Sequence, residues 1–133
     1  MVVVQSGTLL GGRYRLVGRL GKGGMGEVWE AVQEALGRRV AVKILLPELA
    51  QEPELLTRLQ REAQAAASLG HPNIVQITDF VSAPGEPPFM VMELLQGRSF
   101  AQAIEAGPMS ETRVAFIASQ LLDALSVAHR AGI

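Results

Sequence analysis

Three glycines and one lysine are the residues of this sequence whose types and spacing could do chemistry. The glycines follow the pattern Gly21-x-Gly23-x-x-Gly26, and Lys43 ends a short apolar run that begins at residue 40. Glycine has no Cβ, so the backbone can turn tightly and bring its N–H groups against a ligand. Clustered backbone N–H groups form a concavity that binds anions. The pattern therefore predicts a site for a phosphate group, with Lys43 as a nearby positive charge.

The segments on either side of the glycines indicate which kind of nucleotide site this is. Both flanks, 13–20 and 27–32, are short and rich in β-branched, aliphatic and aromatic residues, so both are predicted to be strands. The glycines then form a loop within a hairpin. A dinucleotide-binding fold needs a helix directly after the glycines. A Walker A loop needs Gly-Lys-Ser/Thr, which does not follow here. Both of these alternatives are excluded.

The full order of the motifs carries a family resemblance. Gly-x-Gly-x-x-Gly-x-Val, ending at Val28, is followed by Val-Ala-Val-Lys, ending at Lys43, and this order resembles the start of a protein kinase. The sequence is similar to the N-terminal half of a bacterial (eukaryotic-like) serine/threonine kinase domain. The resemblance implies an α+β fold: a small lobe of five antiparallel strands plus the αC helix, a hinge, and the first helices (αD, αE) of an incomplete large lobe.

The resemblance also implies ATP as the ligand and assigns its contacts. Side chains alternate along a strand, so Ala41 and Lys43 lie on one face, where Lys43 would hold the phosphates and the glycines would cover them. Adenine would lie between apolar side chains, with Met92 as the gatekeeper and the backbone of the hinge beside it. The predicted nucleotide-binding residues are Leu20, Gly21, Gly23, Gly24, Gly26, Val28, Ala41, Lys43, Met92, Glu93 and Leu95. The alternative is that Lys43 is a surface lysine on an edge strand.

Glu62 is predicted to support Lys43. The segment 48–69 is helix-rich, with Pro53 at or near a helix start, and its apolar stripe is Leu55, Leu59, Ala63, Ala66 and Leu69. Glu62 is predicted to lie on this stripe, where a carboxylate is costly without a positive partner. Lys43 is the expected partner, and the resemblance assigns Glu62 to the αC glutamate that pairs with the strand lysine. The alternative is an exposed i, i+4 pair with Arg58.

The rest of the chain is predicted in order as follows. Residues 1–12 are a loose lead-in, 13–95 the small lobe, 93–98 the hinge and 99–133 the start of the large lobe. Further strands are expected over 39–46, 74–81 and 89–95. Ser99 and Ser110 are expected to cap two helices, and the second is expected to end at Ala131-Gly132.

Composition limits the partners. Twelve basic and thirteen acidic residues give a net charge of -1, which argues against a nucleic-acid surface. The chain has no cysteine, so disulfides and thiolate metal sites are excluded, and no metal site is predicted. Neither a signal peptide nor a membrane-spanning segment is recognised. The expectation is a cytoplasmic protein.

The kinase motifs that carry the catalytic base and the metal ligands are not found in these 133 residues. The family's His-Arg-Asp and Asp-Phe-Gly motifs would follow later, and His129-Arg130 is followed by Ala131. The catalytic Asp and the Mg²⁺ ligands are therefore absent, and Mg²⁺ and a protein substrate are expected only for a full-length kinase. The chain alone is predicted to be inactive. The alternatives are a truncated pseudokinase acting as a protein-interaction module, or a fragment with no independent role. An exposed apolar face over 110–131, including Leu121, would allow self-association.

Overall fold

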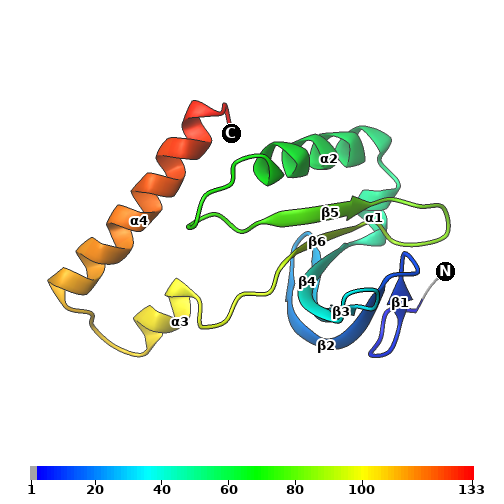
Figure 1. Ribbon diagram of the computed structural model, residues 1–133, viewed down its shortest axis with the longest axis horizontal. Coiled ribbons are helices and arrows are strands. Elements are labelled where there is room, and N and C mark those ends of the chain that lie inside the picture. Colours follow the sequence, from blue (N-terminus) through cyan, green and yellow to red (C-terminus); the bar gives the residue numbers. More distant parts are fainter. Residues whose placement is uncertain (1–2) are drawn as a thin grey trace.

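A computed structural model describes residues 3–133 and contains one antiparallel sheet with helices beyond it (Figure 1). The strands are β1 (Leu9–Leu10), β2 (Tyr14–Gly23), β3 (Gly26–Gln33), β4 (Arg38–Leu45), β5 (Ile77–Val81) and β6 (Phe89–Glu93). Their order across the sheet is β1-β2-β3-β4-β6-β5. The predicted α+β class is confirmed, although the sheet of the described residues has six strands where five were predicted. β5 and β6 are also shorter than the predicted strands 74–81 and 89–95.

The additional strand, β1, lies where a loose lead-in was predicted. Leu9 pairs with Arg15 and Leu10 with Tyr14 in antiparallel register, and Leu10 is fully buried. The intervening Gly11 has a φ of 55°, a left-handed conformation that lets the chain reverse within a few residues. The prediction for 1–12 was therefore wrong at this strand, because two paired residues are too few to show the alternation of a strand.

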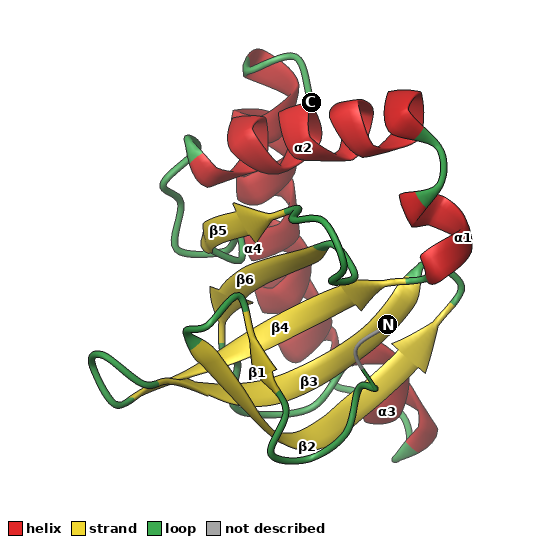
Figure 2. Cartoon of the chain, turned by 90° about the vertical axis from the view of Figure 1, so that its right-hand side faces the viewer, coloured by secondary structure: helices red, strands yellow, loops and turns green. Residues whose placement is uncertain are grey.

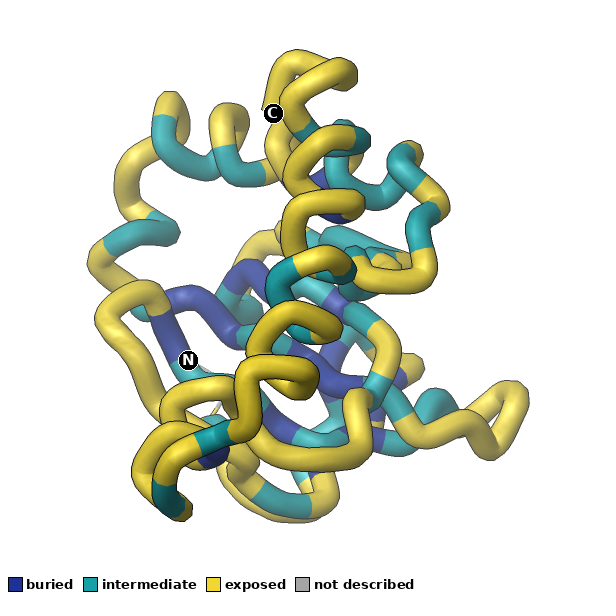
Figure 3. Tube along the Cα trace, turned by 90° about the vertical axis from the view of Figure 1, so that its left-hand side faces the viewer, coloured by how far each residue is buried: buried dark blue, intermediate teal, exposed yellow. Residues whose placement is uncertain are grey.

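The hydrophobic core lies on one face of the sheet. Its buried members are Leu10, Tyr14, Leu16, Trp29, Ala31, Val42, Ile44, Phe89 and Val91. Within each strand these residues are two apart, as expected when alternate side chains point to the same face. The strands that carry them form the dark blue centre of the molecule in Figure 3. The opposite face of the central strands is thereby left for other contacts.

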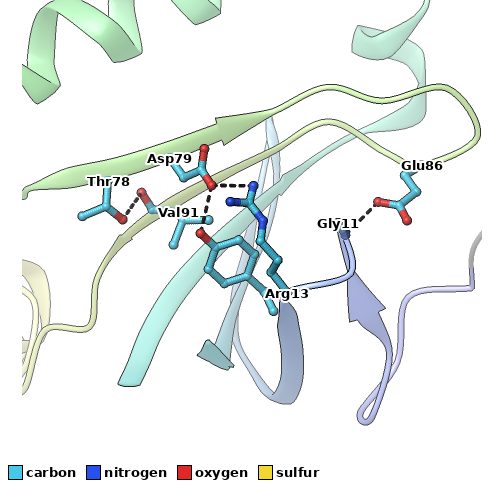
Figure 4. A network of polar contacts seen from close by, with 7 residues as sticks. Gly11, Arg13, Thr78, Asp79, Glu86 and Val91 are labelled. Carbon is cyan, nitrogen blue, oxygen red and sulfur yellow. Dashed lines mark hydrogen bonds and ion pairs between the residues drawn. The ribbon is translucent and has the colours of Figure 1, made fainter. Parts of the chain in front are cut away.

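Polar contacts hold the sheet in a curled shape (Figure 4). The Tyr14 hydroxyl donates to Asp79 Oδ2 at 2.9 Å, and the Arg13 guanidinium lies 2.9 Å from the same oxygen. The Gly11 N–H donates to Glu86 Oε2 at 2.9 Å. Tyr14 is on β2 and Asp79 on β5, which are far apart in the strand order. Their contact therefore requires the sheet to curl, as Figure 2 shows.

The helices are α1 (Pro47–Ala50), α2 (Pro53–Ala67), α3 (Phe100–Glu105) and α4 (Glu111–Arg130). Pro53 begins α2 as predicted, and the predicted caps are confirmed. Ser99 forms a capping box with Gln102, and the Ser110 hydroxyl accepts from the Arg113 N–H. α2 packs along the outer strand β5, whereas α3 and α4 extend away from the sheet (Figure 1).

α4 is a long helix with an exposed apolar face. On this face Leu121 is 52% exposed and Leu125 is 48% exposed, and Ala124 is the one buried residue of the helix. One polar contact reaches it from the loop after α2, where the Asn73 amide donates to Gln120 Oε1 at 3.1 Å. The predicted exposure of the 110–131 face is confirmed. Within residues 3–133, no helix combines the length and apolarity needed to cross a bilayer.

Candidate functional site

The glycine motif forms the end of the hairpin between β2 and β3. The two strands pair up to Gly23 and Gly26, and a turn at Gly24 and Met25 joins them. The predicted strand–glycine–strand arrangement is therefore confirmed. The ladder extends further than predicted, because Gly21 and Gly23 belong to β2 and Gly26 opens β3.

The four glycines differ in what surrounds them. A Cβ on Gly26 would lie 1.9 Å from the backbone oxygen of Ile44, so no other residue fits without moving β4. A Cβ added to Gly21, Gly23 or Gly24 would have no neighbouring atom within 4 Å. Glycine at these three positions leaves the space beside the backbone open, so a ligand such as a phosphate can approach the backbone closely.

The strand register places the predicted adenine and phosphate residues on one face. Val28 pairs with Lys43, which pairs with Met90; in the next row Ala41 pairs with Met92. Directly opposed residues of antiparallel strands have neighbouring side chains on the same face. This face is opposite the core, because the core residues alternate with these positions along each strand.

A cleft of about 360 Å³ lies between the glycine hairpin and β4. It is lined by Gly21, Lys22, Gly23, Gly24, Met25, Gly26, Val28 and Lys43. Six of these were predicted, and the structure brings them together. Lys22 and Met25 were missed, although their positions inside the glycine motif were a usable signal. Lys43 shares the face of Val28 and gives the cleft a positive charge that attracts an anion, whereas the Lys22 side chain pairs with Glu27 on the other face of the hairpin.

The remaining predicted contacts lie outside the lining of this cleft. Leu20 is 54% exposed and sits at an irregularity of the β2–β3 ladder. Ala41 is buried and Met92 is half-buried. At the end of β6, Glu93 accepts a hydrogen bond from the Gln76 N–H at 2.8 Å, and Leu95 is 63% exposed. The structure thus gathers the predicted phosphate site but leaves the predicted adenine residues around it more open.

Glu62 is not where it was predicted. Its side chain is 58% exposed, and it accepts a hydrogen bond from Arg58 Nε at 2.9 Å. The adjacent Ala63 is the buried residue of α2, and one residue along a helix turns the side chain by about 100°. Within residues 3–133, Lys43 makes no ion pair. The expected Lys43–Glu62 contact is not formed in this structure, which shows the i, i+4 pair with Arg58 instead.

Metal binding has no evident centre in this part of the chain. Among residues 3–133, no group of three His, Cys, Asp or Glu side chains is close enough to hold an ion. A polyphosphate fits this cleft better, because glycine backbone without side chains and the positively charged Lys43 meet in it.

Comparisons with known proteins bear on this arrangement. The family model described as "Protein kinase domain" matches residues 14–133. The serine/threonine-protein kinase PknA of Mycobacterium tuberculosis (strain ATCC 25618 / H37Rv) is 39% identical over 132 residues, covering 96% of this chain and 31% of PknA. Serine/threonine-protein kinase Pkn1 of Myxococcus xanthus is 42% identical over 122 residues, covering 92% of this chain and 17% of Pkn1.

Solved structures resemble the fold as well. The crystal structure of the Mycobacterium tuberculosis PknI kinase domain superposes with a TM-score of 0.83 at 29% identity. The match covers 99% of this chain and 54% of that kinase domain. The chain therefore spans about half the length of the solved kinase domain and less than a third of these two curated relatives.

Proposed function

Because the chain belongs to the protein kinase domain family, we propose that it is the ATP-binding part of a serine/threonine protein kinase. In a longer kinase this part would serve transfer of the ATP γ-phosphate to Ser or Thr hydroxyls of a protein substrate. The observation that carries the proposal is the cleft beneath the glycine hairpin. It joins uncovered glycine backbone to Lys43 on the ligand-facing side of β4.

Each part of the cleft has a role in this proposal. The N–H groups near Gly21, Gly23 and Gly24 cover the phosphates, and Lys43 neutralises their charge. Val28 and Ala41, on the same sheet face as Lys43, contact the flat adenine ring. Leu20 closes over the ring. At the far end of the site, Met92 limits the pocket and the backbone at 93–95 hydrogen-bonds to the adenine edge.

Glu62 has a conditional role in the same proposal. Its pair with Arg58 is exposed on both sides, so exchanging that partner costs little. We expect Glu62 to leave Arg58 and pair with Lys43 when ATP is bound and α2 is held in the active arrangement. A Glu62→Gln variant would then bind ATP more weakly, because Lys43 loses its support.

ATP binding is tested by calorimetry with the 133-residue chain and its Lys43→Met variant. We expect wild-type binding and at least a tenfold loss in the variant, since a phosphate–lysine contact in a cleft is a charge-assisted interaction. Arg39→Met is the matched control, because Arg39 lies on the same face of β4 but pairs with Glu30. Equal losses in both variants would contradict a specific role for Lys43.

Catalysis requires more than this chain contains. Phosphoryl transfer depends on a base and on metal ligands as well as on ATP contacts, and neither family motif occurs in the sequence. Mg²⁺ would accompany ATP in the longer kinase. We therefore expect the chain alone to transfer no γ-phosphate to a protein substrate beyond the level of Lys43→Met. Transfer above that level would overturn this expectation.

A second candidate is a non-catalytic pseudokinase that acts by protein contacts, and the exposed apolar face of α4 favours it. Apolar patches of this kind mark interaction surfaces. Lys43→Met separates the two candidates in cells. Survival of function would favour the interaction module, whereas its loss would favour nucleotide binding.

A further inference from the structure

Glu27 contacts three hydrogen-bonding or charged side chains at the base of the glycine hairpin. Its Oε1 lies 3.2 Å from an Arg19 guanidinium nitrogen and 3.9 Å from Lys22 Nζ. Its Oε2 accepts from Trp29 Nε1 at 3.1 Å. The Glu27 side chain is 23% exposed, against 55% for Arg19 and 64% for Lys22. We call these four residues the Glu27 cluster; it is a largely shielded carboxylate with cations on its outer side.

The Glu27 cluster bridges an interruption in the β2–β3 ladder. Lys22 pairs directly with Glu27, and Arg19 pairs with Trp29, but the register shifts between Arg19 and Gly21 because Leu20 is unpaired. Such a bulge weakens the ladder and bends the strand. Glu27 contacts residues on both sides of it. The carboxylate therefore supplies side-chain contacts across the point where the backbone pairing is irregular.

This cluster lies on the face of the hairpin opposite the candidate nucleotide. Val28 and Lys43 share the ligand face, and Glu27 and Trp29 flank Val28 on β3, so they point the other way. Glu27 consequently cannot touch the phosphates that Lys43 would hold. Apart from the repulsion between its charge and the phosphates, any effect of Glu27 on nucleotide binding has to act through the shape of the hairpin.

We propose that Glu27 is a positioning residue that holds the glycine hairpin in its phosphate-binding conformation, an inference that rests on the proposed ATP-binding function. Glycine-rich backbone loses much conformational freedom when it becomes ordered. No neighbouring atoms crowd the space beside the Cα atoms of Gly21, Gly23 and Gly24, so packing does little to restrain them. The Glu27 cluster reduces this cost before the ligand arrives, and preorganisation of this kind raises affinity.

The competing explanation is that Glu27 forms an ordinary exposed ion pair, which contributes little to the stability of the hairpin. The sequence offers a matched example. Arg15 and Glu34 pair at the other end of the same two strands, with Nε–Oε1 at 2.5 Å and with 47% and 43% exposure. The Glu34 side chain is nearly twice as exposed as that of Glu27, and the Trp29 indole donates to Glu27 instead. Comparing Glu27→Ala with Glu34→Ala therefore isolates the position and environment of the Glu27 cluster.

The test measures binding of ATP and of adenosine to the 133-residue chain and both variants by calorimetry. Because the hairpin acts on the phosphates, we expect Glu27→Ala to weaken ATP binding roughly three- to tenfold. Adenosine binding should stay within about twofold of wild type. Glu34→Ala should change neither. Glu27→Gln, which keeps an acceptor for the Trp29 indole, should fall between wild type and Glu27→Ala.

Two outcomes overturn the role of Glu27. In one, ATP affinity in Glu27→Ala equals that of Glu34→Ala; in the other, ATP and adenosine weaken equally, as a general loss of folding would cause. If wild type binds neither ligand, the proposed function fails. Hydrogen exchange measured without nucleotide then tests the order of the hairpin on its own. The amides of residues 21–26 are expected to exchange faster in Glu27→Ala than in Glu34→Ala. Equal exchange rates in the two variants contradict the role of Glu27.

Discussion

The curled sheet and α4 are both built from regularly spaced apolar residues, yet they use them differently. Phe89 on β6 is fully buried in the sheet core, whereas Leu121 on the apolar face of α4 is 52% exposed. In the sheet, the apolar positions of neighbouring strands meet because the strands pair and curl. In α4, the spacing is equally regular, but no second layer of the described residues covers it (Figure 3). Amphipathic spacing therefore identifies the apolar face of an element. Whether that face is buried depends on the other elements that pack against it.

The two regions also obtain stability from different sources. The sheet combines a shared core with polar ties between distant strands, such as Tyr14 to Asp79. α4 relies on local interactions: its own backbone hydrogen bonds, the Ser110 cap and the basic residues of its last turn. Isolated helices of ordinary length are marginal in water. We therefore expect the sheet to be the more stable of the two, and the following experiments test that difference.

The largest effect is expected from truncating one phenylalanine in each region. Phe89→Ala removes a fully buried ring that packs edge-to-face on Tyr14, and should lower the free energy of unfolding by about 3–5 kcal/mol. Phe116→Ala should change it by less than about 0.5 kcal/mol. Urea denaturation measures both. If Phe89→Ala does not fold, Phe89→Leu should still be less stable than Phe116→Ala; equal stabilities would contradict the comparison.

Hydrogen exchange should separate α4 from β4 in the wild-type chain. Amides over 112–130 are expected to exchange on the order of a hundredfold faster than those of β4, because opening α4 exposes little buried apolar surface. The measurement is made on a verified monomer, since self-association through the apolar face would protect α4. Protection of α4 equal to that of β4 in the monomer would show that the helix is better supported than its exposure indicates.

A smaller effect on stability is expected from removing the hydrogen bond that joins β2 to β5. Tyr14→Phe removes the hydroxyl that donates to Asp79 and should cost about 1 kcal/mol of stability. Burial, the hydrogen bond to Asp79 and the charge of Asp79 together raise the pKa of Tyr14 above 10.0, against a smaller opposing effect of Arg13.

The raised pKa gives this tie a pH dependence with a definite sign. The folded chain keeps the Tyr14 proton more tightly than the unfolded chain, so the contribution is complete below pH 10 and falls as pH rises through the folded pKa. Wild type should therefore lose stability in this range more steeply than Tyr14→Phe. Thermal melts of both chains across this pH range measure it; parallel curves would contradict the assignment.

The smallest effect is expected at Glu62. Glu62→Gln breaks the exposed pair with Arg58 and should change stability by only a few tenths of a kcal/mol. A parallel thermal melt of Arg58→Gln should give a similar value. A loss above about 1 kcal/mol in Glu62→Gln alone would show that Glu62 has a second partner in the folded chain.

The sequence predicted those features that local signals determine. The glycine hairpin followed from strand residues on both sides of the motif, and both serine caps followed from residue type at the helix starts. Ala41 and Lys43 could be assigned to one face because side chains alternate along a strand. These features depend on a few neighbouring residues, so a single sequence carries enough information.

Other features depended on geometry that the sequence does not show. Glu62 was assigned to the buried stripe of α2, but spacing alone does not determine which way a helix is rotated against its neighbour. β1 was missed because its pairing depends on the left-handed turn at Gly11. The bulge at Leu20 was also unpredicted, since no residue type specifies it. Because the sequence does not reveal this bulge, it also could not show that Glu27 makes contacts on both sides of it.

The contact between Gly26 and the Ile44 carbonyl has a consequence for selection experiments. A Cβ added to Gly21, Gly23 or Gly24 would meet no atom within 4 Å, and none of the three has a left-handed φ, so folding alone does not demand glycine there. Position 26 tolerates no side chain beside β4. In a library randomised at positions 21, 23, 24 and 26 and screened only for folded protein, glycine should be retained at 26 and replaced by other residues at the other three positions. The same library screened for retention on immobilised ATP should recover all four glycines.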